Sequence, residues 1–162
     1  MTAQALYRQK RTTATDAVRH VHNGDTIIVS TGVGEPPTLL TELSTQRHSF
    51  QDVKVAQILA LRKYAYFDPE TVANVRHVAL FYGPASRAGG QAGWVDFTPN
   101  YFSEIPAQIE RGQIPAEVVF SMASPMDAHG YFSLSLGADY TMAAVAKARA
   151  VLLEVNPNVP FA

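Results

Sequence analysis

The fold class is decided by residues 26–37, which read TIIVSTGVGEPP. The β-branched run 26–29 predicts a short buried strand, because strands of a covered parallel sheet show continuous apolar runs rather than alternation. Gly32 and Gly34 predict a tight turn after this strand. Pro36 and Pro37 suit the first turn of a helix, which reaches about residue 47 with three leucines on one face. This stretch is therefore one strand–turn–helix unit.

The same alternation continues along the chain. Further strands are expected at 53–59, 78–82, 118–122 and 151–155, with a short edge strand at 94–97. Further helices are expected at 15–22, 103–112 and 138–148, with helical turns near 68–70 and within 85–93. Thr15 and Ser103 are the expected N-caps of the first two of these helices. The sequence predicts an α/β fold with three layers, a mostly parallel sheet and helices on both faces.

Composition narrows the class of protein. The 162 residues are 47% apolar and 17% charged, and 13 basic against 14 acidic residues give a net charge of −1. This composition excludes a disordered chain and argues against a basic nucleic-acid-binding surface. With no cysteine there is no disulfide or thiolate metal site, and no apolar run reaches membrane-spanning length. We expect a cytoplasmic protein with a polar segment at 1–13, which lacks a secretory signal, and one domain at 14–162.

The carboxy-terminal third carries little charge. Five charged residues lie among the 45 residues from Val118 to Ala162: Asp127, Asp139, Lys147, Arg149 and Glu154. A small domain needs charge on its large surface. Either this segment lies at the centre of the fold, or a partner covers it.

Ligands of open parallel sheets bind beyond the carboxyl ends of the strands, which here directs attention to loops 30–37, 60–66, 83–93 and 124–137. The Gly32-x-Gly34 turn and the N–H groups at the following helix start favour an anion or a carbonyl oxygen. The alternative is a purely structural turn, and proline at position 37 breaks the dinucleotide-binding glycine pattern. Ser86 and Arg87 follow another strand, where arginine anchors a carboxylate or phosphate or simply faces solvent.

Other polar residues carry weaker signals. Asp127 and His129 suggest a metal or acid–base role, but Asp127 can equally cap its own turn beside Gly130. Glu35 and Glu104 are the carboxylates nearest these loops, and each can instead occupy the start of a helix. The histidines do not cluster at ligand spacing, so no metal site is predicted. The loops hold no paired acid–base cluster, which disfavours a sugar-phosphate isomerase or deaminase.

Several segments together resemble a known family. Residues 121–132, SMASPMDAHGYF, resemble the "SPPD-HG" segment of the acetyl-CoA hydrolase and class I CoA-transferase family, especially its 4-hydroxybutyrate CoA-transferase branch. Residues 101–106, YFSEIP, resemble its "SE-P" segment, and residues 154–160, EVNPNVP, its "EVN-N-P" segment. FYGPASR at 81–87 and GVGEP at 32–36 fall in the matching order. The resemblance extends from about residue 14 to the end.

The resemblance implies two similar α/β halves, a dimer and ping-pong acyl transfer. A glutamate of the second half attacks the acyl-CoA thioester, forms a mixed anhydride and becomes a glutamyl-CoA thioester, which a second carboxylic acid resolves. This chain is then the amino-terminal domain alone, with no catalytic residue and no activity in isolation. Coenzyme A enters as part of the substrate, and no bound cofactor is implied.

The family also implies where substrate lies. Gly32, Val33 and Gly34 would line the acyl pocket, Ser86 and Arg87 would lie near the carboxylate end, and Glu35 completes the predicted substrate-binding set. The implied partners are acyl-CoA, a short-chain carboxylate, the carboxy-terminal half and a further copy of the protein. The isolated chain is expected to expose an apolar patch and to self-associate.

Two other functions stay open. In an acyl-CoA hydrolase of the same family, water resolves the acyl-enzyme instead of a carboxylate. In a non-catalytic scaffold, this domain completes a pocket that belongs to a partner.

Overall fold

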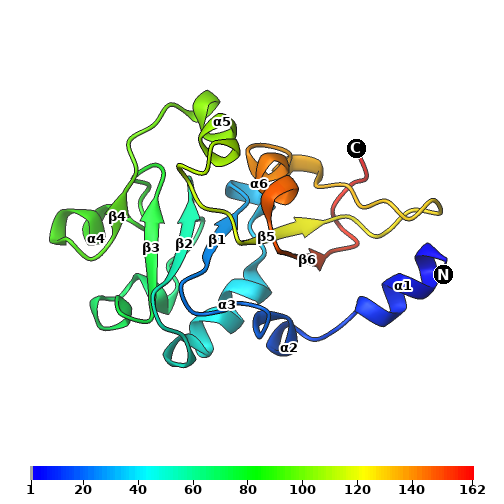
Figure 1. The fold of residues 1–162 in the computed structure, drawn as a ribbon, viewed down its shortest axis with the longest axis horizontal. Coiled ribbons are helices and arrows are strands. Elements are labelled where there is room, and N and C mark those ends of the chain that lie inside the picture. Colours follow the sequence, from blue (N-terminus) through cyan, green and yellow to red (C-terminus); the bar gives the residue numbers. More distant parts are fainter. Residues whose placement is uncertain (1) are drawn as a thin grey trace.

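A computed structural model describes residues 2–162. Its strands are β1 (Thr26–Val29), β2 (Val53–Gln57), β3 (Val75–Ala79), β4 (Asp96–Phe97), β5 (Val118–Ala123) and β6 (Ala150–Val155). Its α-helices are α1 (Ala3–Lys10), α2 (Ala14–Val18), α3 (Pro37–Thr45), α4 (Arg87–Ala92), α5 (Ile105–Glu110) and α6 (Thr141–Lys147). The strands form one sheet in the order β4-β3-β2-β1-β5-β6, and every neighbouring pair is parallel (Figure 1).

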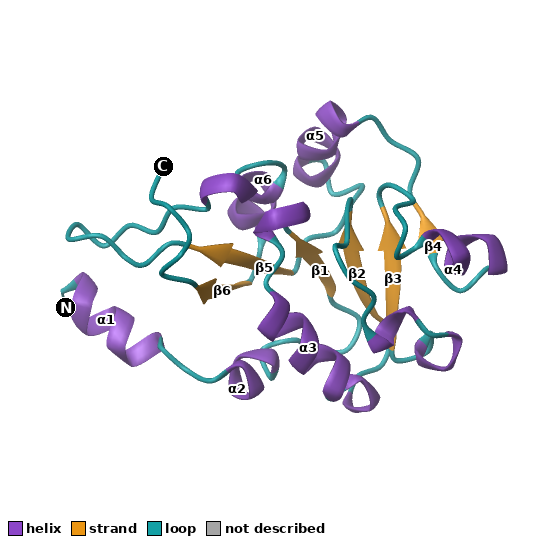
Figure 2. Ribbon diagram, turned by 180° about the vertical axis from the view of Figure 1, so that it is seen from behind, coloured by secondary structure: helices purple, strands orange, loops and turns teal. Residues whose placement is uncertain are grey.

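Helices cover both faces of this sheet, which confirms the predicted three-layer α/β fold (Figure 2). Strand β1 shows the reason, because all four of its residues are buried. Ile27 and Val29 belong to one apolar core, together with residues of α2 and α3. Ile28 points the other way, into a second core with residues of α5 and α6. A strand that is buried on both faces needs a near-continuous apolar run, as residues 27–29 provide.

The third strand was predicted three residues too late. It spans Val75–Ala79 rather than 78–82. The polar residues Arg76 and His77 interrupt the apolar run that would otherwise predict this strand. His77 is buried and its ring lies 4.3 Å from that of Phe67, so it behaves as a core side chain. The apolar residues after β3 lie past the strand, and Phe81 is exposed.

Helix starts also differ from the predictions. Thr13, not Thr15, caps α2, and its hydroxyl accepts a hydrogen bond of 3.1 Å from the Asp16 N–H. Ser103 makes no cap bond, because a 3-10 turn at Phe102–Glu104 leads into α5. The polar segment 1–13 contains α1, which buries no residue and extends from the body of the molecule toward the loop that carries Phe132 (Figures 1 and 2). Within residues 2–162, no helix combines the length and hydropathy that crossing a membrane requires.

Candidate functional site

Exposed apolar side chains lie at the end of the sheet where the strands have their carboxyl ends. Val33 follows β1, Leu61 follows β2, Phe81 follows β3, and Leu136 lies in the long segment after β5. Their exposed fractions are 59%, 57%, 55% and 71%. We call these four residues the apolar rim. Because parallel strands end at the same edge, these loops share the side of the sheet on which α/β proteins bind ligands. Large apolar side chains exposed at one edge indicate a surface that binds something.

Two glycines set the spacing between the rim loops. Gly32–Gly34 forms a 3-10 turn after β1, and Ser135–Gly137 forms another before α6. A Cβ atom on Gly34 would lie 2.9 Å from the Cα of Gly137, so the two turns meet backbone to backbone. Gly32 has a φ of +52°, which favours glycine. The Gly-x-Gly pair therefore packs the turn that carries Val33 against the turn that carries Leu136.

The Glu35 carboxylate joins the loops after β1 and β2. It is 4% exposed and accepts hydrogen bonds from the Tyr64 hydroxyl (2.6 Å), the Gln57 Nε2 (2.9 Å) and the Leu61 N–H (3.0 Å). Burial, followed by the hydrogen bond to Glu35, raises the pKa of Tyr64 well above its usual value, so Tyr64 stays a donor. Glu35 thus fixes the backbone of Leu61, a rim residue.

A second buried polar group lies beneath the rim. The Ser30 hydroxyl donates to Ser121 at 2.7 Å and lies 2.9 Å from the hydroxyl of Thr141. Asp139 accepts from the Thr31 N–H at 3.2 Å and from the Thr141 hydroxyl at 2.6 Å. These bonds tie the end of β1 to β5 and to the start of α6. The segments that carry Val33 and Leu136 are therefore flanked by a buried hydrogen-bond network.

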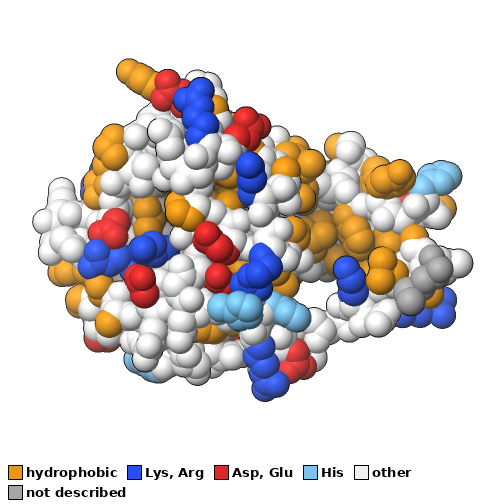
Figure 3. Space-filling view, in the orientation of Figure 1, with side chains coloured by type: hydrophobic (Ala, Val, Ile, Leu, Met, Phe, Trp, Pro, Cys, Tyr) orange, Lys and Arg blue, Asp and Glu red, His pale blue; other side chains and the backbone are white. Residues whose placement is uncertain are grey.

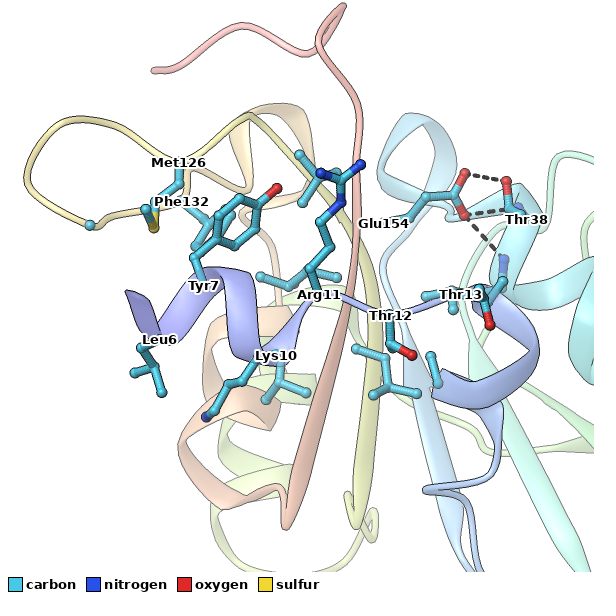
Figure 4. A pocket seen from close by; sticks show the side chains of 18 of the residues that line it. Leu6, Tyr7, Lys10, Arg11, Thr12, Thr13, Thr38, Met126, Phe132 and Glu154 are labelled. Atoms are coloured by element: carbon cyan, nitrogen blue, oxygen red, sulfur yellow. Dashed lines mark hydrogen bonds between the residues drawn. The ribbon is translucent and has the colours of Figure 1, made fainter. Parts of the chain in front are cut away.

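The start of α3 is not free to bind an anion, which corrects one expectation. Pro36 precedes the helix and offers no side-chain cap. Glu154, at the end of β6, accepts instead from the Thr38 N–H (2.8 Å), the Leu39 N–H (3.1 Å) and the Thr38 hydroxyl (2.7 Å), as Figure 4 shows. A carboxylate at a helix start satisfies its N–H groups and favours its dipole. The helix end is therefore occupied by Glu154, and ligand binding by the Gly32–Gly34 turn itself stays a prediction.

Ser86 and Arg87 lie apart from the other predicted site residues. Strand β2 separates the loop after β3 from the loop after β1. Ser86 is buried, and its hydroxyl donates to the Gly83 carbonyl at 3.5 Å. Arg87 is exposed at the start of α4, where it contacts the Tyr82 carbonyl at 3.5 Å. Within residues 2–162, neither side chain hydrogen-bonds to residues 32–35. Their role toward a substrate carboxylate stays a prediction.

In the Asp127–His129 loop, Asp127 caps its own turn, which was the structural alternative to a metal or acid–base role. One Asp127 oxygen accepts from the Tyr131 N–H at 2.8 Å and from the His129 N–H at 2.9 Å. The hydrogen bond from the Tyr131 backbone is the main cause that lowers the pKa of Asp127. Gly130 has a φ of +95°, as expected for this turn. Across residues 2–162, no three His, Asp or Glu side chains form a metal-binding group.

Gln57 and Tyr64 were not identified from the sequence. Gln57 is fully buried at the end of β2, where its amide donates to Glu35, and Tyr64 comes from the following loop. A signal existed, because an amide that ends an apolar strand must find a buried partner. The partner itself, 22 residues earlier in the chain, could not be read from spacing.

Comparison with known proteins identifies the family. Residues 1–162 match the family model described as the acetyl-CoA hydrolase/transferase N-terminal domain. A succinyl-CoA:cyclohexane-1-carboxylate CoA transferase of Geobacter metallireducens is 38% identical over 154 residues, which are 95% of this chain and 35% of that protein. A 4-hydroxybutyrate coenzyme A transferase of Clostridium kluyveri is 31% identical over 157 residues, which are 97% of this chain and 37% of that protein.

Solved structures agree. RipA from Yersinia pestis superposes with a TM-score of 0.89 at 29% identity, over 99% of this chain and 39% of that one. A 4-hydroxybutyrate CoA-transferase from Porphyromonas gingivalis superposes with a TM-score of 0.72 at 25% identity, over 98% of this chain and 36% of that one. The chain thus spans little more than a third of the length of these relatives. These matches confirm the resemblance, and the chain belongs to the acetyl-CoA hydrolase/transferase family, in which it corresponds to the N-terminal domain.

Proposed function

We propose that this chain is the amino-terminal part of an acyl-CoA:carboxylate CoA-transferase for short-chain acids of the 4-hydroxybutyrate and acetate type. The observation that carries the proposal is the apolar rim, which places one exposed apolar side chain on each of four strand-end segments. An acyl chain that leaves water for such a surface gains about 0.8 kcal/mol for each buried methylene. Relatives named as CoA transferases support transfer as the reaction.

The rim suits this task because its loops are already fixed. Glu35 holds the backbone of Leu61, and the contact of Gly34 with Gly137 holds the turns of Val33 and Leu136. A wall that does not move on binding spends little free energy on ordering. In the proposed enzyme, Gly32, Val33 and Gly34 contact the acyl group, and Ser86 and Arg87 lie toward the carboxylate end.

The nucleophile belongs to the carboxy-terminal part of the enzyme. Glu35 is an unsuitable nucleophile, because three hydrogen bonds engage its buried carboxylate. In the proposed reaction, a glutamate of the other part attacks the thioester carbon and the C–S bond breaks, which releases the coenzyme A thiolate. That thiolate then attacks the glutamyl carbon of the anhydride, giving glutamyl-CoA and the free acid. The isolated chain accordingly lacks activity.

The test compares the chain alone with the chain joined to a carboxy-terminal part. CoA transfer from butyryl-CoA to acetate or 4-hydroxybutyrate is followed by chromatography of the acyl-CoA products. We expect no turnover by the chain alone, and turnover that requires the acceptor carboxylate in the joined protein. Release of free CoA without an acceptor would instead identify a hydrolase. An inactive joined protein would favour the scaffold function, and turnover by the chain alone would place the nucleophile within residues 1–162.

The proposal includes a homo-oligomeric enzyme in the cytoplasm. Its support is the low charge of residues 118–162, where a partner surface is expected. Analytical ultracentrifugation over a wide concentration range tests the association. We expect the chain alone to self-associate, and a strict monomer would contradict this part of the proposal.

A further inference from the structure

Strand β6 leaves one edge of the sheet without a partner. It pairs with β5 on one side and ends the sheet on the other. The Ala150 N–H donates to Glu117 and the Asn156 N–H donates to Ala123, so even-numbered residues face β5. Because backbone groups alternate along a parallel strand, Val151, Leu153 and Val155 direct their N–H and C=O groups away from β5. Within residues 2–162, none of the backbone hydrogen bonds outside the helices and strand ladders uses these N–H groups.

This edge lacks the features that protect free strands. The opposite edge strand, β4, has two residues, and its Asp96 is paired with Arg76 at 2.6 Å. Strand β6 is three times as long, and its sequence AVLLEV contains no lysine or proline. Its one charge, Glu154, is directed to the start of α3. Long apolar edges pair with other chains unless something covers them.

A cavity of about 700 Å³ lies beside β6. Its walls are β6, helix α1, the start of α3 and residues of the loop 126–132 (Figure 4). In Figure 3, hydrophobic side chains gather in the hollow between the body of the molecule and the segment that carries α1. Helix α1 buries no residue, and its Tyr7 ring lies 5.7 Å from the ring of Phe132 at the far wall. The space is open to solvent, and an exposed apolar surface of this kind beside a free strand edge is typical of a binding site for another segment.

We propose that an apolar strand from the carboxy-terminal part of the enzyme pairs with β6 and fills the cavity between β6 and α1. The inference rests on the two-part arrangement proposed above. The relatives support it, because they extend far beyond the matched N-terminal domain, which is 35–37% of their length. The three outward-facing N–H groups are available to acceptors, and a strand supplies acceptors at the matching spacing.

Charge specifies the occupant further. Lys10 and Arg11 line the cavity at the end of α1, and no ion pair within residues 2–162 uses either of them. Figure 4 shows both side chains at this cavity. These two exposed cations favour an apolar strand that carries a carboxylate near its end. A second copy of this chain is the competing occupant, and the experiment separates the two.

The test measures backbone hydrogen exchange by NMR in the chain alone and in the protein joined to its carboxy-terminal part. We expect the amides of Val151, Leu153 and Val155 to exchange at least 100-fold more slowly in the joined protein. The Leu152 amide, which faces β5, is the internal reference. Protection of residues 59–63 reports separately whether the carboxy-terminal part covers the rim.

Each outcome has a distinct meaning. A protected rim with unprotected β6 amides overturns this inference and leaves the proposed function standing. If neither region is protected, the two-part arrangement fails and both proposals fall. Protection of the β6 amides in the chain alone, rising with concentration, assigns the edge to a second copy and overturns the inference.

A matched pair of variants adds a second readout. The Val151 side chain is 37% exposed and lines the cavity, so a polar replacement is compatible with folding. In the joined protein, Val151→Lys is expected to reduce the protection of the β6 amides at least 10-fold, whereas Val151→Ile retains it. Equal protection in the two variants would contradict the proposal.

Discussion

Replacing Glu35 tests how the rim is held. Glu35→Ala removes the acceptor of three donors: the Tyr64 hydroxyl, the Gln57 amide and the Leu61 N–H. A buried donor left without a partner costs about 1–3 kcal/mol, and water that enters the space recovers part of this loss. We expect the free energy of unfolding to fall by about 3–5 kcal/mol. Glu35→Gln keeps the shape and one acceptor oxygen, so it is expected to lose about 1–2 kcal/mol.

Urea unfolding followed by circular dichroism measures these changes. Glu110→Ala is the matched control, because Glu110 is exposed at the end of α5 and is expected to change stability by less than about 0.5 kcal/mol. Hydrogen exchange adds a local readout, in which the Leu61 amide exchanges faster in Glu35→Ala. A Glu35→Ala protein as stable as the Glu110→Ala control would refute the assignment of Glu35 as the residue that joins the two loops.

Three further results are expected. Glu154→Ala leaves the start of α3 uncapped and lowers the free energy of unfolding by about 1–2 kcal/mol, measured by urea unfolding; an unchanged midpoint would contradict the cap. Burial lowers the pKa of His77 to about 3. Below about pH 6.5, His77 is therefore protonated in the unfolded chain but stays neutral in the folded protein. The free energy of unfolding falls as the pH drops from 6.5 toward 3. Between pH 7.0 and 5.5 the natural protein should lose about 1 kcal/mol more than His77→Phe, and parallel losses would show that His77 can be protonated in the fold. Gly34→Ala pushes a Cβ against Gly137 and should cost about 1–3 kcal/mol, visible as a lower thermal midpoint; full stability would mean that the two turns can separate.

The architecture could be predicted because most of its strands are formed by apolar runs that are visible in the sequence. Strand β1 is β-branched throughout and is followed by a glycine turn and a proline-started helix, so both the type and the bounds of the strand were predicted correctly. The prediction of strand β3 was displaced along the chain, because histidine is a polar residue type but His77 is buried among aromatic rings in the fold. Helix α1 was missed because its residues are mostly polar, so the segment 1–13 was interpreted as a polar arm.

The sequence predicted where the candidate site lies in the sheet, but not which residues contact one another there. Parallel strands put Gly32–Glu35 at the carboxyl edge, and that position follows from the sequence. The partners of Glu35 and the cap from Glu154 depend on residues 22 to 116 positions apart, which spacing does not reveal. The three hydrogen bonds of Glu35 show a loop anchor, which the sequence did not reveal, and its contact with substrate stays a prediction.

Photo-crosslinking tests the central claim most directly. An acyl-CoA with a diazirine on its short acyl chain is bound to the joined protein and irradiated, and the labelled residues are mapped by mass spectrometry. We predict adducts on residues 32–34, around Leu61 and on the carboxy-terminal part. Labelling that avoids every residue of the apolar rim would contradict the claim that this domain forms a wall of the acyl pocket.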